Sequence, residues 1–503
     1  MFKKILIANR GEIAGRVILA CRELGISTVA VYSEPDAAMP WVRLADEAYL
    51  LKGTSAVETY LNQEAIFRAA RTADVDAIHP GYGFLSENPV FAAACAEHNL
   101  TFIGPKPQVI QFMGSKAQAR ELAVTCGVPV VPGLDGAGLS DVELADAVEA
   151  IAYPLLIKAS AGGGGKGMRI VYSAAEFHDA VKLARGEALS SFGNDHILVE
   201  RYLREIHHVE IQILGDQHGR VLHLFERDCS IQRRHQKIIE ESPSPAISDD
   251  LRARMAEAAV SLATAAGYEN AGTVEFIVDG SGSFYFLEMN TRLQVEHPVT
   301  ELITGFDLAA WQIRIAAGEA LPFTQDEIQR RGHALECRVY AEDPAQGFLP
   351  STGVLTTYRP PSGPGVRIDD GVESGSEVTP YYDPMLAKVI TWGQDRLEAV
   401  RKMERALRDM VVLGVTTNIP YLLSILGQEA FRSGNTTTNY LEQHMAGWVP
   451  GVSADEDVLL AAAIFEALQS GGTRARNQDI SEEVEARADP WNDLTSWRNV
   501  QGV

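Results

Sequence analysis

The amino-acid sequence predicts a multidomain protein that combines α/β and α+β architecture. Its 503 residues correspond to about three or four domains of ordinary size. Short apolar strands alternate with helices near the amino terminus, and strands predominate between residues 204 and 330. Alternation is typical of βαβ units with a parallel sheet. Apolar residues make up 46% of the chain and charged residues 22%, which excludes a mainly disordered protein.

The first domain is predicted over residues 1–113 as a Rossmann-like fold. A buried strand over residues 3–8 is followed by an amphipathic helix over 12–24 and a β-branched strand over 27–32. The further predicted elements are helices over 63–71 and 90–98 and strands over 77–79 and 101–103. Residues 9–14 read Asn-Arg-Gly-Glu-Ile-Ala and lack the GxGxxG dinucleotide fingerprint, so an NAD-binding role is not expected.

The pattern changes in the next two regions. Residues 114–330 begin with a helix and a Pro/Gly-rich link and then become rich in strands. The strands predicted there span residues 155–159, 209–214, 221–226, 274–278 and 284–290. Residues 331–446 mix short strands and Pro/Gly loops with one helix over 397–410, which predicts a further, mixed domain.

The chain is acidic and carries no pattern of a secreted or membrane protein. It has 44 Lys and Arg against 67 Asp and Glu, and the net charge of −23 repels nucleic acid and anionic membranes over most of the surface. The apolar run that begins at Ile5 breaks at Asn9, which is too short for a signal peptide. Five scattered cysteines without a CxxC pair indicate reduced thiols rather than a zinc site or a disulfide framework. We therefore expect a cytoplasmic protein.

A glycine-rich loop follows the predicted strand at 155–159. Four consecutive glycines start at Gly162, between Lys158 and Lys166. Such a loop brings backbone N–H groups close to phosphate oxygens, and the lysines supply positive charge. The GxxxxGK[ST] spacing of a Walker A loop is absent. We interpret the loop as a phosphate-binding element; the alternative is a flexible linker, which the flanking strands and lysines disfavour.

A predicted hairpin carries two carboxylates and an amide. With Gly280-Ser281 at its tip, Glu275 would face Phe286 and would be a diagonal neighbour of Glu288, about 7 Å away or less. Residues 286, 288 and 290 would then share one side of the sheet, together with Phe284. Carboxylate and amide oxygens suit Mg²⁺ or Mn²⁺, which clamp nucleotide phosphates. The alternative is a solvated face, which the two phenylalanines argue against.

Two further segments indicate anion binding. Arg292, Gln294 and Glu296 project the same way in an extended chain, so Arg and Gln offer donors to a small oxyanion and Glu296 lies beside them as a base. The run over residues 226–237 is a basic cluster in an acidic protein. The alternatives are a surface salt-bridge ladder for the first segment and a solvated positive face for the second.

Together, these segments resemble the biotin carboxylases of the ATP-grasp superfamily. The resemblance extends from residue 1 to about residue 446 and rests on long motifs at residues 7–13, 79–88, 158–168, 226–237 and 288–298. It implies an ATP-grasp domain over 114–330 with a mobile glycine-rich lid at about 131–203. It also implies a biotin carboxylase C-terminal domain over 331–446, which leaves residues 447–503 as a helical extension.

The resemblance also implies roles for individual residues. The ATP-contacting positions are Lys116, Lys158, Gly163, Gly164, Gly165, Glu200, Arg201, Leu203, His208, Gln232, His235, Glu275 and Glu288. The ligands of two Mg²⁺ or Mn²⁺ ions are Glu275, Glu288 and Asn290. The positions around bicarbonate and biotin are Lys237, Arg292, Gln294, Val295, Arg338 and Tyr82, with His235 also near the ureido ring. The catalytic set is Glu296, Arg338, Lys237 and Arg292.

The implied reaction is the carboxylation of biotin N1′ by bicarbonate and ATP through carboxyphosphate, the first half-reaction of an acetyl-CoA or other acyl-CoA carboxylase in fatty acid biosynthesis. Three alternatives stay open. The first is the biotin carboxylase subunit of a pyruvate or 2-oxoglutarate carboxylase. The second is an ATP-grasp ligase with another acceptor, and the third is a non-catalytic assembly subunit.

The implied partners are a biotin carboxyl carrier protein and carboxyltransferase subunits. The sequence contains no Ala-Met-Lys-Met segment, so we expect biotin to arrive on a separate carrier, and we expect a homodimer as in the relatives. In the extension, Ser453 and Glu456 have capping-box spacing and an apolar run over 458–468 predicts a helix. We interpret 447–503 as a subunit-docking segment; the alternative is a frayed helix with a disordered tail.

Overall fold

The computed structural model of the chain describes residues 1–159, 168–192, 194–234, 236–451, 460, 464 and 465. The chain divides into two compact units, residues 1–449 and 450–503, and the helices and strands with defined bounds all belong to the first. Most of the helix predicted over 458–468, with Ser453 and Glu456 before it, lies outside the described residues. Within the described part of the chain, no helix combines the length and the hydropathy needed to cross a membrane.

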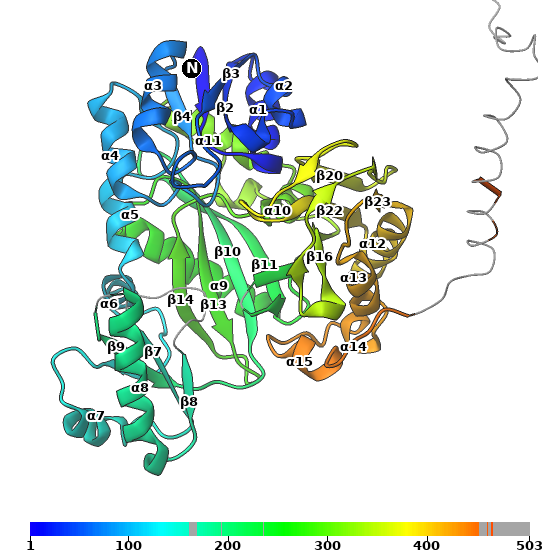
Figure 1. Ribbon diagram of the computed structural model, residues 1–503. Helices are drawn as coiled ribbons and strands as arrows, with labels where there is room; N and C mark the ends of the chain where they lie inside the picture. Colours follow the sequence, from blue (N-terminus) through cyan, green and yellow to red (C-terminus); the bar gives the residue numbers. More distant parts are fainter. Residues whose placement is uncertain (160–167, 193, 235, 452–459, 461–463, 466–503) are drawn as a thin grey trace, which may run out of the picture. The chain divides into compact units, whose positions relative to one another are not determined.

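The amino-terminal part is a parallel sheet of five strands in the order β3-β2-β1-β4-β5, flanked by helices (Figure 1). The strands are β1 (Lys4–Ile7), β2 (Ser27–Ser33), β3 (Glu47–Leu51), β4 (Ala77–His79) and β5 (Thr101–Phe102). The helices predicted here are α1 (Gly11–Glu23), α3 (Gln63–Ala73) and α4 (Pro89–Glu97). The predicted parallel, Rossmann-like sheet is confirmed, whereas β3 and the short helix α2 (Pro40–Leu44) were not predicted.

Local side chains fix where these helices begin. The Asn88 side chain accepts the backbone N–H groups of the second and third residues of α4, and Pro89 occupies the first helical position. The Asn62 side chain caps α3 by accepting the backbone N–H of its third residue, Ala65. Gly11 has a φ of +67°, which lets the chain turn sharply from β1 into α1. This turn directs Glu12, the next residue, into the protein interior.

A smaller antiparallel sheet, in the order β6-β9-β7-β8, has an apolar core of its own. Its elements are β6 (Gly133–Asp135), α7 (Asp141–Val148), β7 (Leu155–Ala159), β8 (Arg169–Val171), α8 (Ala174–Phe192) and β9 (Ile197–Arg201). Strand β7 begins and ends where predicted, and Leu155 and Ile157 pack with Phe177 of α8. The glycine run, including Gly163, Gly164 and Gly165, lies outside the described residues.

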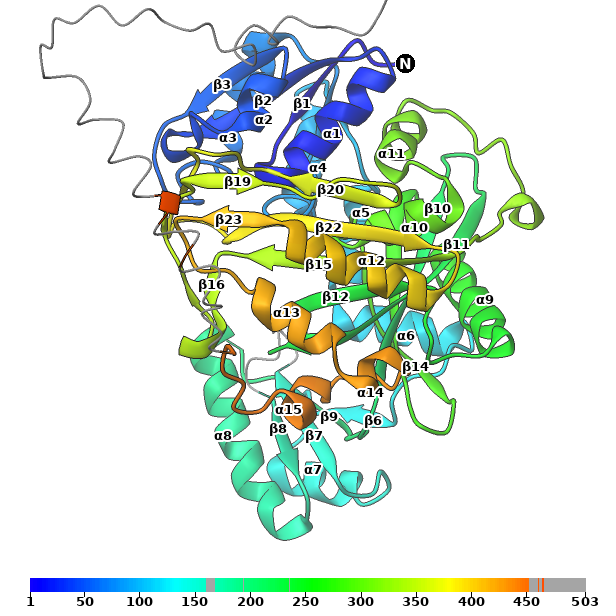
Figure 2. The ribbon, with the colours of Figure 1, turned by 90° about the vertical axis from the view of Figure 1, so that its right-hand side faces the viewer.

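The largest sheet has eight antiparallel strands in the order β14-β13-β10-β11-β12-β15-β22-β20. They are β10 (His207–Gly215), β11 (Val221–Arg233), β12 (Gln236–Ser242), β13 (Asn270–Val278), β14 (Phe284–Asn290), β15 (His333–Tyr340), β20 (Val366–Asp370) and β22 (Met385–Gly393). The predicted strands at 209–214, 221–226, 274–278 and 284–290 are confirmed. Strand β12 was not predicted, and β15, β20 and β22 lie in the region for which only short strands without ranges were predicted. Strand β12 pairs with β15, so the sheet crosses the predicted domain boundary after residue 330 (Figure 2).

The two faces of this sheet differ in polarity. On one face, Ile211 of β10 packs with Met255 of α9 (Asp249–Ala265), and β15 and β22 pack against α12 (Arg396–Asp409), the confirmed helix of the third region. The other face carries His208 and Glu210, which alternate with the apolar residues along β10. Helix α10 (His297–Thr304) lies against this polar face and contributes Thr300 to it. Because both faces are covered, the charged face is buried.

The turn of the β13–β14 hairpin is longer than predicted. It spans Asp279 to Ser283 rather than Gly280 and Ser281 alone, because the Asp279 backbone N–H donates to the Ser283 carbonyl at 2.9 Å. The Asp279 carboxylate also accepts the backbone N–H groups of Ser281 and Ser283, at 2.9 and 3.1 Å. These bonds stabilise a longer loop, which shifts the strand register by one residue relative to the prediction.

A bulge beside Glu275 shifts the register by a second residue. Glu275 therefore lies directly opposite Glu288, so the predicted diagonal arrangement was wrong, and direct partners are closer than diagonal ones. Phe286 pairs with Phe276, and the Phe284 and Phe286 rings both contact the Phe276 ring in the apolar core. The prediction that these phenylalanines share the face of the carboxylates was also wrong.

We expect Glu241→Gln to lower the stability of the fold at pH 7 and to weaken its acid dependence. Arg396 binds the two carboxylate oxygens of Glu241 at 2.6 and 3.0 Å, and His333 Nε2 lies 2.7 Å from one of them. Burial raises the pKa of this carboxyl, but Arg396 and His333 together have the larger, opposite effect and lower the pKa to about 2. A folded-state pKa below the ordinary 4.5 stabilises the protein above pH 4.5, and that stability is lost as the pH falls towards 2. The variant should lose about 3 kcal/mol at pH 7.

Urea unfolding of the wild type and of Glu241→Gln at pH 7 and at pH 3.5 measures this effect. The difference in the free energy of unfolding should be smaller at pH 3.5 than at pH 7. A difference that is the same at both pH values would contradict the assigned ion pair.

Candidate active site

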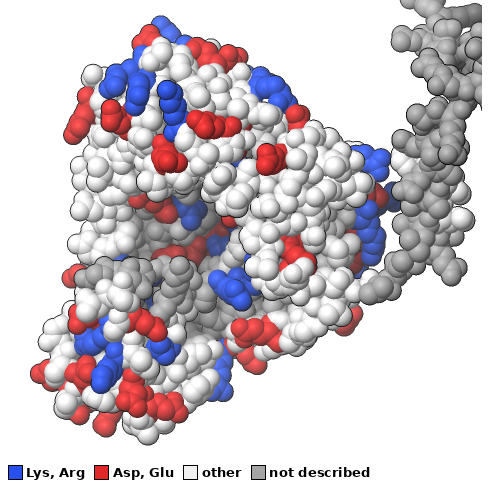
Figure 3. Space-filling view, in the orientation of Figure 1, with Lys and Arg blue, Asp and Glu red and all other residues white. Residues whose placement is uncertain are grey.

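Charged side chains lie in a row across the buried polar face of the eight-stranded sheet. Glu288 of β14 lies opposite Glu275 of β13, Glu275 opposite Glu210 of β10, and Glu210 opposite Arg227 of β11. The surface is hollowed near these strands, and both acidic and basic side chains lie in the hollow (Figure 3). Since directly opposed residues have Cβ atoms about 4.5–5.5 Å apart, these charges act directly on one another.

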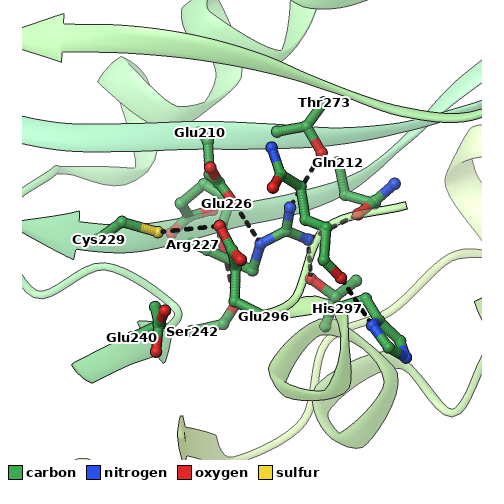
Figure 4. A network of polar contacts seen from close by, with 12 residues as sticks. Glu210, Gln212, Glu226, Arg227, Cys229, Glu240, Ser242, Thr273, Glu296 and His297 are labelled. Atoms are coloured by element: carbon green, nitrogen blue, oxygen red, sulfur yellow. Dashed lines mark hydrogen bonds and ion pairs between the residues drawn. The ribbon is translucent and has the colours of Figure 1, made fainter. Parts of the chain in front are cut away.

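Arg227 is fully buried, and every nitrogen of its guanidinium donates a hydrogen bond (Figure 4). Nε donates to Glu210 at 2.5 Å, and Nη1 donates to Gln212 at 2.6 Å and to Thr300 at 2.9 Å. Nη2 donates to Thr273 at 3.0 Å. A buried guanidinium is stable only when it is paired and hydrogen-bonded in this way. Arg227 therefore fixes three strands and α10 relative to one another.

The Lys237 ammonium contacts three carboxylates at once. Its Nζ lies 2.6 Å from Glu210, 2.7 Å from Glu296 and 2.9 Å from Glu275. Burial lowers the pKa of this lysine, but the negative charges around it raise the pKa well above its usual value. Lys237 therefore stays protonated, and it is the cation that allows three buried acids to lie together.

Glu296 is held through both carboxylate oxygens. Lys237 binds Oε1, and Arg338 Nη2 donates to Oε2 at 2.9 Å. Burial raises the pKa of Glu296, but these two cations have the larger, opposite effect, so the pKa lies well below its usual value. Glu296 is therefore an ionised carboxylate at neutral pH, the form that accepts a proton. Arg338 also binds Glu240, whose pKa burial raises to about 7.

Glu275 accepts hydrogen bonds from four side chains. His208 Nε2 lies 2.8 Å from one oxygen, and Asn290 Nδ2 and Gln294 Nε2 lie 2.7 and 3.4 Å from the other, which Lys237 also contacts. Burial raises the pKa of Glu275, but Lys237 and His208 lower it well below its usual value. In contrast, burial and the charge of Glu275 raise the pKa of Glu288 opposite.

The amino-terminal part reaches this cluster through Glu87. Arg292 Nε donates to Glu87 at 2.8 Å, and the backbone N–H of Thr291 donates to the same carboxylate at 3.0 Å. Arg292 Nη1 also donates to Gln294 Oε1 at 2.8 Å. These bonds place a guanidinium and an amide side by side, as the sequence predicted for a small-oxyanion site.

A second charged group lies at the small sheet. Lys158 of β7 pairs with Glu200 of β9 at 2.5 Å, and Arg120 Nη1 lies 3.2 Å from the same carboxylate. Burial lowers the pKa of Lys116 below its usual value, and the charge of Glu288 offsets this only in part. The charges of Lys158 and Glu200 in the small sheet also act on Lys116, so this lysine is near enough to both sheets to feel their charges.

The structure thus brings together His208, Lys237, Glu275, Asn290, Gln294, Glu296 and Arg338, all of them predicted from the sequence. Gln232 lies opposite Lys237 in the β11–β12 pair. Arg201 is exposed at the end of β9, Leu203 and Val295 are half-buried, and Tyr82 donates to Glu12 rather than to the cluster. Gly163, Gly164, Gly165 and His235 lie outside the described residues.

Sequence reasoning missed Glu87, Glu210, Arg227 and Glu240. The run His-Val-Glu-Ile-Gln around Glu210 alternates polar and apolar residues, which fits a solvent-exposed strand face equally well. Arg227 and Glu240 lie in segments that were considered only as a basic cluster or were not assigned a strand. Glu210 and Arg227 could have been found only from the burial of both faces of the sheet. No local sequence pattern encodes that burial.

Three family models match consecutive parts of the chain: "Biotin carboxylase, N-terminal domain" over residues 1–110, "Carbamoyl-phosphate synthase L chain, ATP binding domain" over 115–324 and "Biotin carboxylase C-terminal domain" over 336–443. The chain is 53% identical over 446 residues to biotin carboxylase 2 of Bacillus subtilis, which covers 88% of this chain and 100% of that protein. It is also 53% identical to the mitochondrial methylcrotonoyl-CoA carboxylase subunit alpha of Oryza sativa, over 88% of this chain and 60% of that protein.

The fold is similar to that of a solved structure from Hydrogenobacter thermophilus. That structure is the biotin carboxylase domain dimer of 2-oxoglutarate carboxylase in complex with MgADP, ADP and bicarbonate. The TM-score is 0.85 at 49% identity, over 89% of this chain and 98% of the other. The predicted multidomain α/β fold and the predicted resemblance are therefore confirmed, and this chain belongs to the biotin carboxylase family of ATP-dependent ligases.

Proposed function

We propose that this chain uses ATP and bicarbonate to carboxylate N1′ of biotin that is attached to a separate carrier protein. The observation that carries the proposal is the position of Glu296, an ionised carboxylate held between Lys237 and Arg338. A base and two cations around one point suit a reaction in which an oxyanion is deprotonated and then attacks a phosphoryl group.

ATP would bind between the small sheet and the charged row of the large sheet. Lys116 and Lys158 supply the positive charge that phosphates require, and Glu200 already holds Lys158 in place. We propose the same region for the other nucleotide positions that the resemblance implies, namely Gly163, Gly164, Gly165, Arg201, Leu203, His208, Gln232 and His235. The related Hydrogenobacter domain was solved in complex with MgADP, which supports nucleotide binding by this chain.

Mg²⁺ or Mn²⁺ fits the hairpin of β13 and β14. Glu275 and Glu288 face each other; burial and then the charge of Glu275 raise the pKa of Glu288, and a divalent cation would relieve the repulsion between the two carboxylates. Asn290 would add its amide oxygen, which here accepts a hydrogen bond from Arg292 Nη2 at 3.4 Å while its amide nitrogen donates to Glu275. Among the described residues, His208, Glu210 and Glu275 also have ligand atoms within 4.8 Å of one another, but Arg227 and Lys237 both bind Glu210 already. Bound at Glu275, Glu288 and Asn290, the metal would neutralise charge on the transferring phosphate.

In the first stage, Glu296 takes the proton of bicarbonate. The resulting carbonate oxygen attacks the γ-phosphorus of ATP, which gives carboxyphosphate and ADP. Arg292 and Gln294 would hold the carbonate oxygens, and Lys237 would offset the charge that spreads over the transferring group. The step is mainly one of positioning and electrostatic stabilisation, which the fixed hydrogen bonds of these side chains favour.

In the second stage, carboxyphosphate breaks down to CO2 and phosphate. The phosphate removes the proton from biotin N1′, and the nitrogen attacks the carbon of CO2. Negative charge develops on the ureido oxygen of biotin during this attack, and the Arg338 guanidinium would stabilise it. Tyr82 would lie near the ureido ring.

We propose acetyl-CoA or another acyl-CoA as the final acceptor, with carboxyltransferase subunits as partners and a homodimer as the assembly. The methylcrotonoyl-CoA carboxylase relative supports an acyl-CoA, whereas the 2-oxoglutarate carboxylase relative supports the alternative of a keto acid. The dimer named for the Hydrogenobacter structure supports the homodimer.

ADP release by the purified chain, with Mg-ATP and with or without bicarbonate and free biotin, tests the proposed reaction. We expect release that requires bicarbonate and rises with biotin. Release that is independent of both compounds would overturn the proposal and favour an ATP-grasp ligase with a different acceptor.

A further inference from the structure

A buried lysine lies next to the active site in a position that the proposed reaction does not use. Lys388, in β22, has a relative exposure of 0%. In the sheet register it lies directly opposite Arg338 of β15 on one side and Asp369 of β20 on the other. Two cations in direct cross-strand contact repel each other, so this arrangement needs anions or acceptors around each of them.

Lys388 contacts three different segments of the chain. Its Nζ lies 2.9 Å from the backbone carbonyl of Val295, 3.2 Å from Glu12 and 3.6 Å from Asp369. Glu12 in turn accepts a hydrogen bond from the Tyr82 hydroxyl. The contact with the Val295 carbonyl is a hydrogen bond, whereas Glu12 and Asp369 are bound as ion pairs.

The bond to Val295 fixes the peptide that leads into Glu296. A peptide unit is planar, so a carbonyl that is held on one side also sets the direction of the following N–H and Cα. Glu296 is the N-cap residue of α10, and Gln294 directly precedes Val295. The backbone that carries Gln294 and Glu296 is therefore oriented by the ammonium of Lys388, which lies 93 residues from Val295 in sequence.

We propose that Lys388 is a positioning residue for the reaction with bicarbonate. It holds the segment from Gln294 to Glu296 in the geometry that binds bicarbonate and presents the base. This inference rests on the proposed function. Asp369 does not depend on this lysine, because Arg367 already binds it through two bonds of 2.7 Å, whereas the buried Glu12 is paired with Lys388.

Steady-state ADP release by Lys388→Met tests this role. Methionine keeps the length of the side chain but removes the donor to Val295. We expect kcat/KM for bicarbonate to fall roughly 10- to 100-fold, the size of effect that a small misplacement of reacting groups produces. KM for ATP should stay unchanged, because Lys116, Lys158 and their contacts are not altered.

Two further variants keep the test decisive. If Lys388→Met does not fold because Glu12 is left charged and buried, the double variant Glu12→Gln/Lys388→Met removes that charge. Its comparison with Glu12→Gln alone isolates the bond to Val295. Arg367→Met is the matched control, since it removes a cation from the same network, where Arg367 binds Asp369 and Glu301.

The outcomes separate positioning from general destabilisation. The proposal predicts a loss specific to bicarbonate in the Lys388 variants and none in Arg367→Met. Equal losses for bicarbonate and ATP, an equal bicarbonate loss in Arg367→Met, or no change in the Lys388 variants would each overturn it. Failure of the proposed function itself is recognised separately, as bicarbonate-independent ADP release by the wild type.

Discussion

Glu296→Gln is expected to reduce bicarbonate-dependent ADP release by about 10²- to 10⁴-fold, the contribution that a general base makes. The amide has nearly the shape of the carboxylate and keeps one oxygen as an acceptor for Lys237 or Arg338, which both bind Glu296 in the wild type. It cannot accept the proton of bicarbonate. The measurement is kcat for ADP release with saturating Mg-ATP and bicarbonate.

ATP affinity and a second glutamate variant serve as controls. The binding of ATP should be nearly normal, since the nucleotide lysines are untouched. Glu241→Gln is a matched control because Glu241 is also a buried glutamate paired with an arginine, but it lies at the far end of β12 and outside the cluster. It should retain turnover at pH 7. Normal turnover in Glu296→Gln would contradict the role of this residue as the base.

Arg338→Lys is expected to lower carboxybiotin formation by about 10²- to 10³-fold, as for the loss of an oxyanion-stabilising donor. The variant keeps a positive charge between Glu240 and Glu296, so the two buried acids stay compensated. It loses the planar fork of the guanidinium, which can bind two partners and still direct a donor at the substrate. The reaction should therefore fail mainly in its second stage.

The ratio of carboxybiotin formed to ADP released distinguishes the two stages. In Arg338→Lys this ratio should fall, while bicarbonate-dependent ADP release without biotin should be much less affected. In Glu296→Gln both products should fall together. If Arg338→Lys lost both products in proportion, Arg338 would act on Glu296 alone and not on biotin.

Apolar and alternating runs predicted nine of the 23 strands in the described part of the chain, and the sequence motifs named most of the residues that meet around Lys237. The apolar run of β7 and the hairpin strand β14 have the predicted bounds, and the residues around Glu296 stand in one long motif. Strand β12 was missed because Gln236–Ser242 is mostly polar. Its buried carboxylates are paired with arginines of β15 and α12, which its own sequence does not reveal.

Register and long-range pairing could not be predicted locally. The position of Glu275 opposite Glu288 depends on the turn at Asp279 and on a bulge, and each of these shifts the strands by one residue. The contact of Glu87 with Arg292 joins residues 205 positions apart. Such contacts follow from how the sheets pack, and a short sequence window contains no information about them.

The continuous sheet has a consequence for recombination between family members. The family model of the C-terminal domain begins at residue 336, which lies inside β15. This strand pairs with β12, which belongs to the preceding region. A graft of this domain from a relative would set a foreign β15 against the native β12. A slip of one residue at that seam would turn Arg338 towards the apolar core and Cys337 into the active site. The unit that can be exchanged in a chimera is therefore the whole sheet.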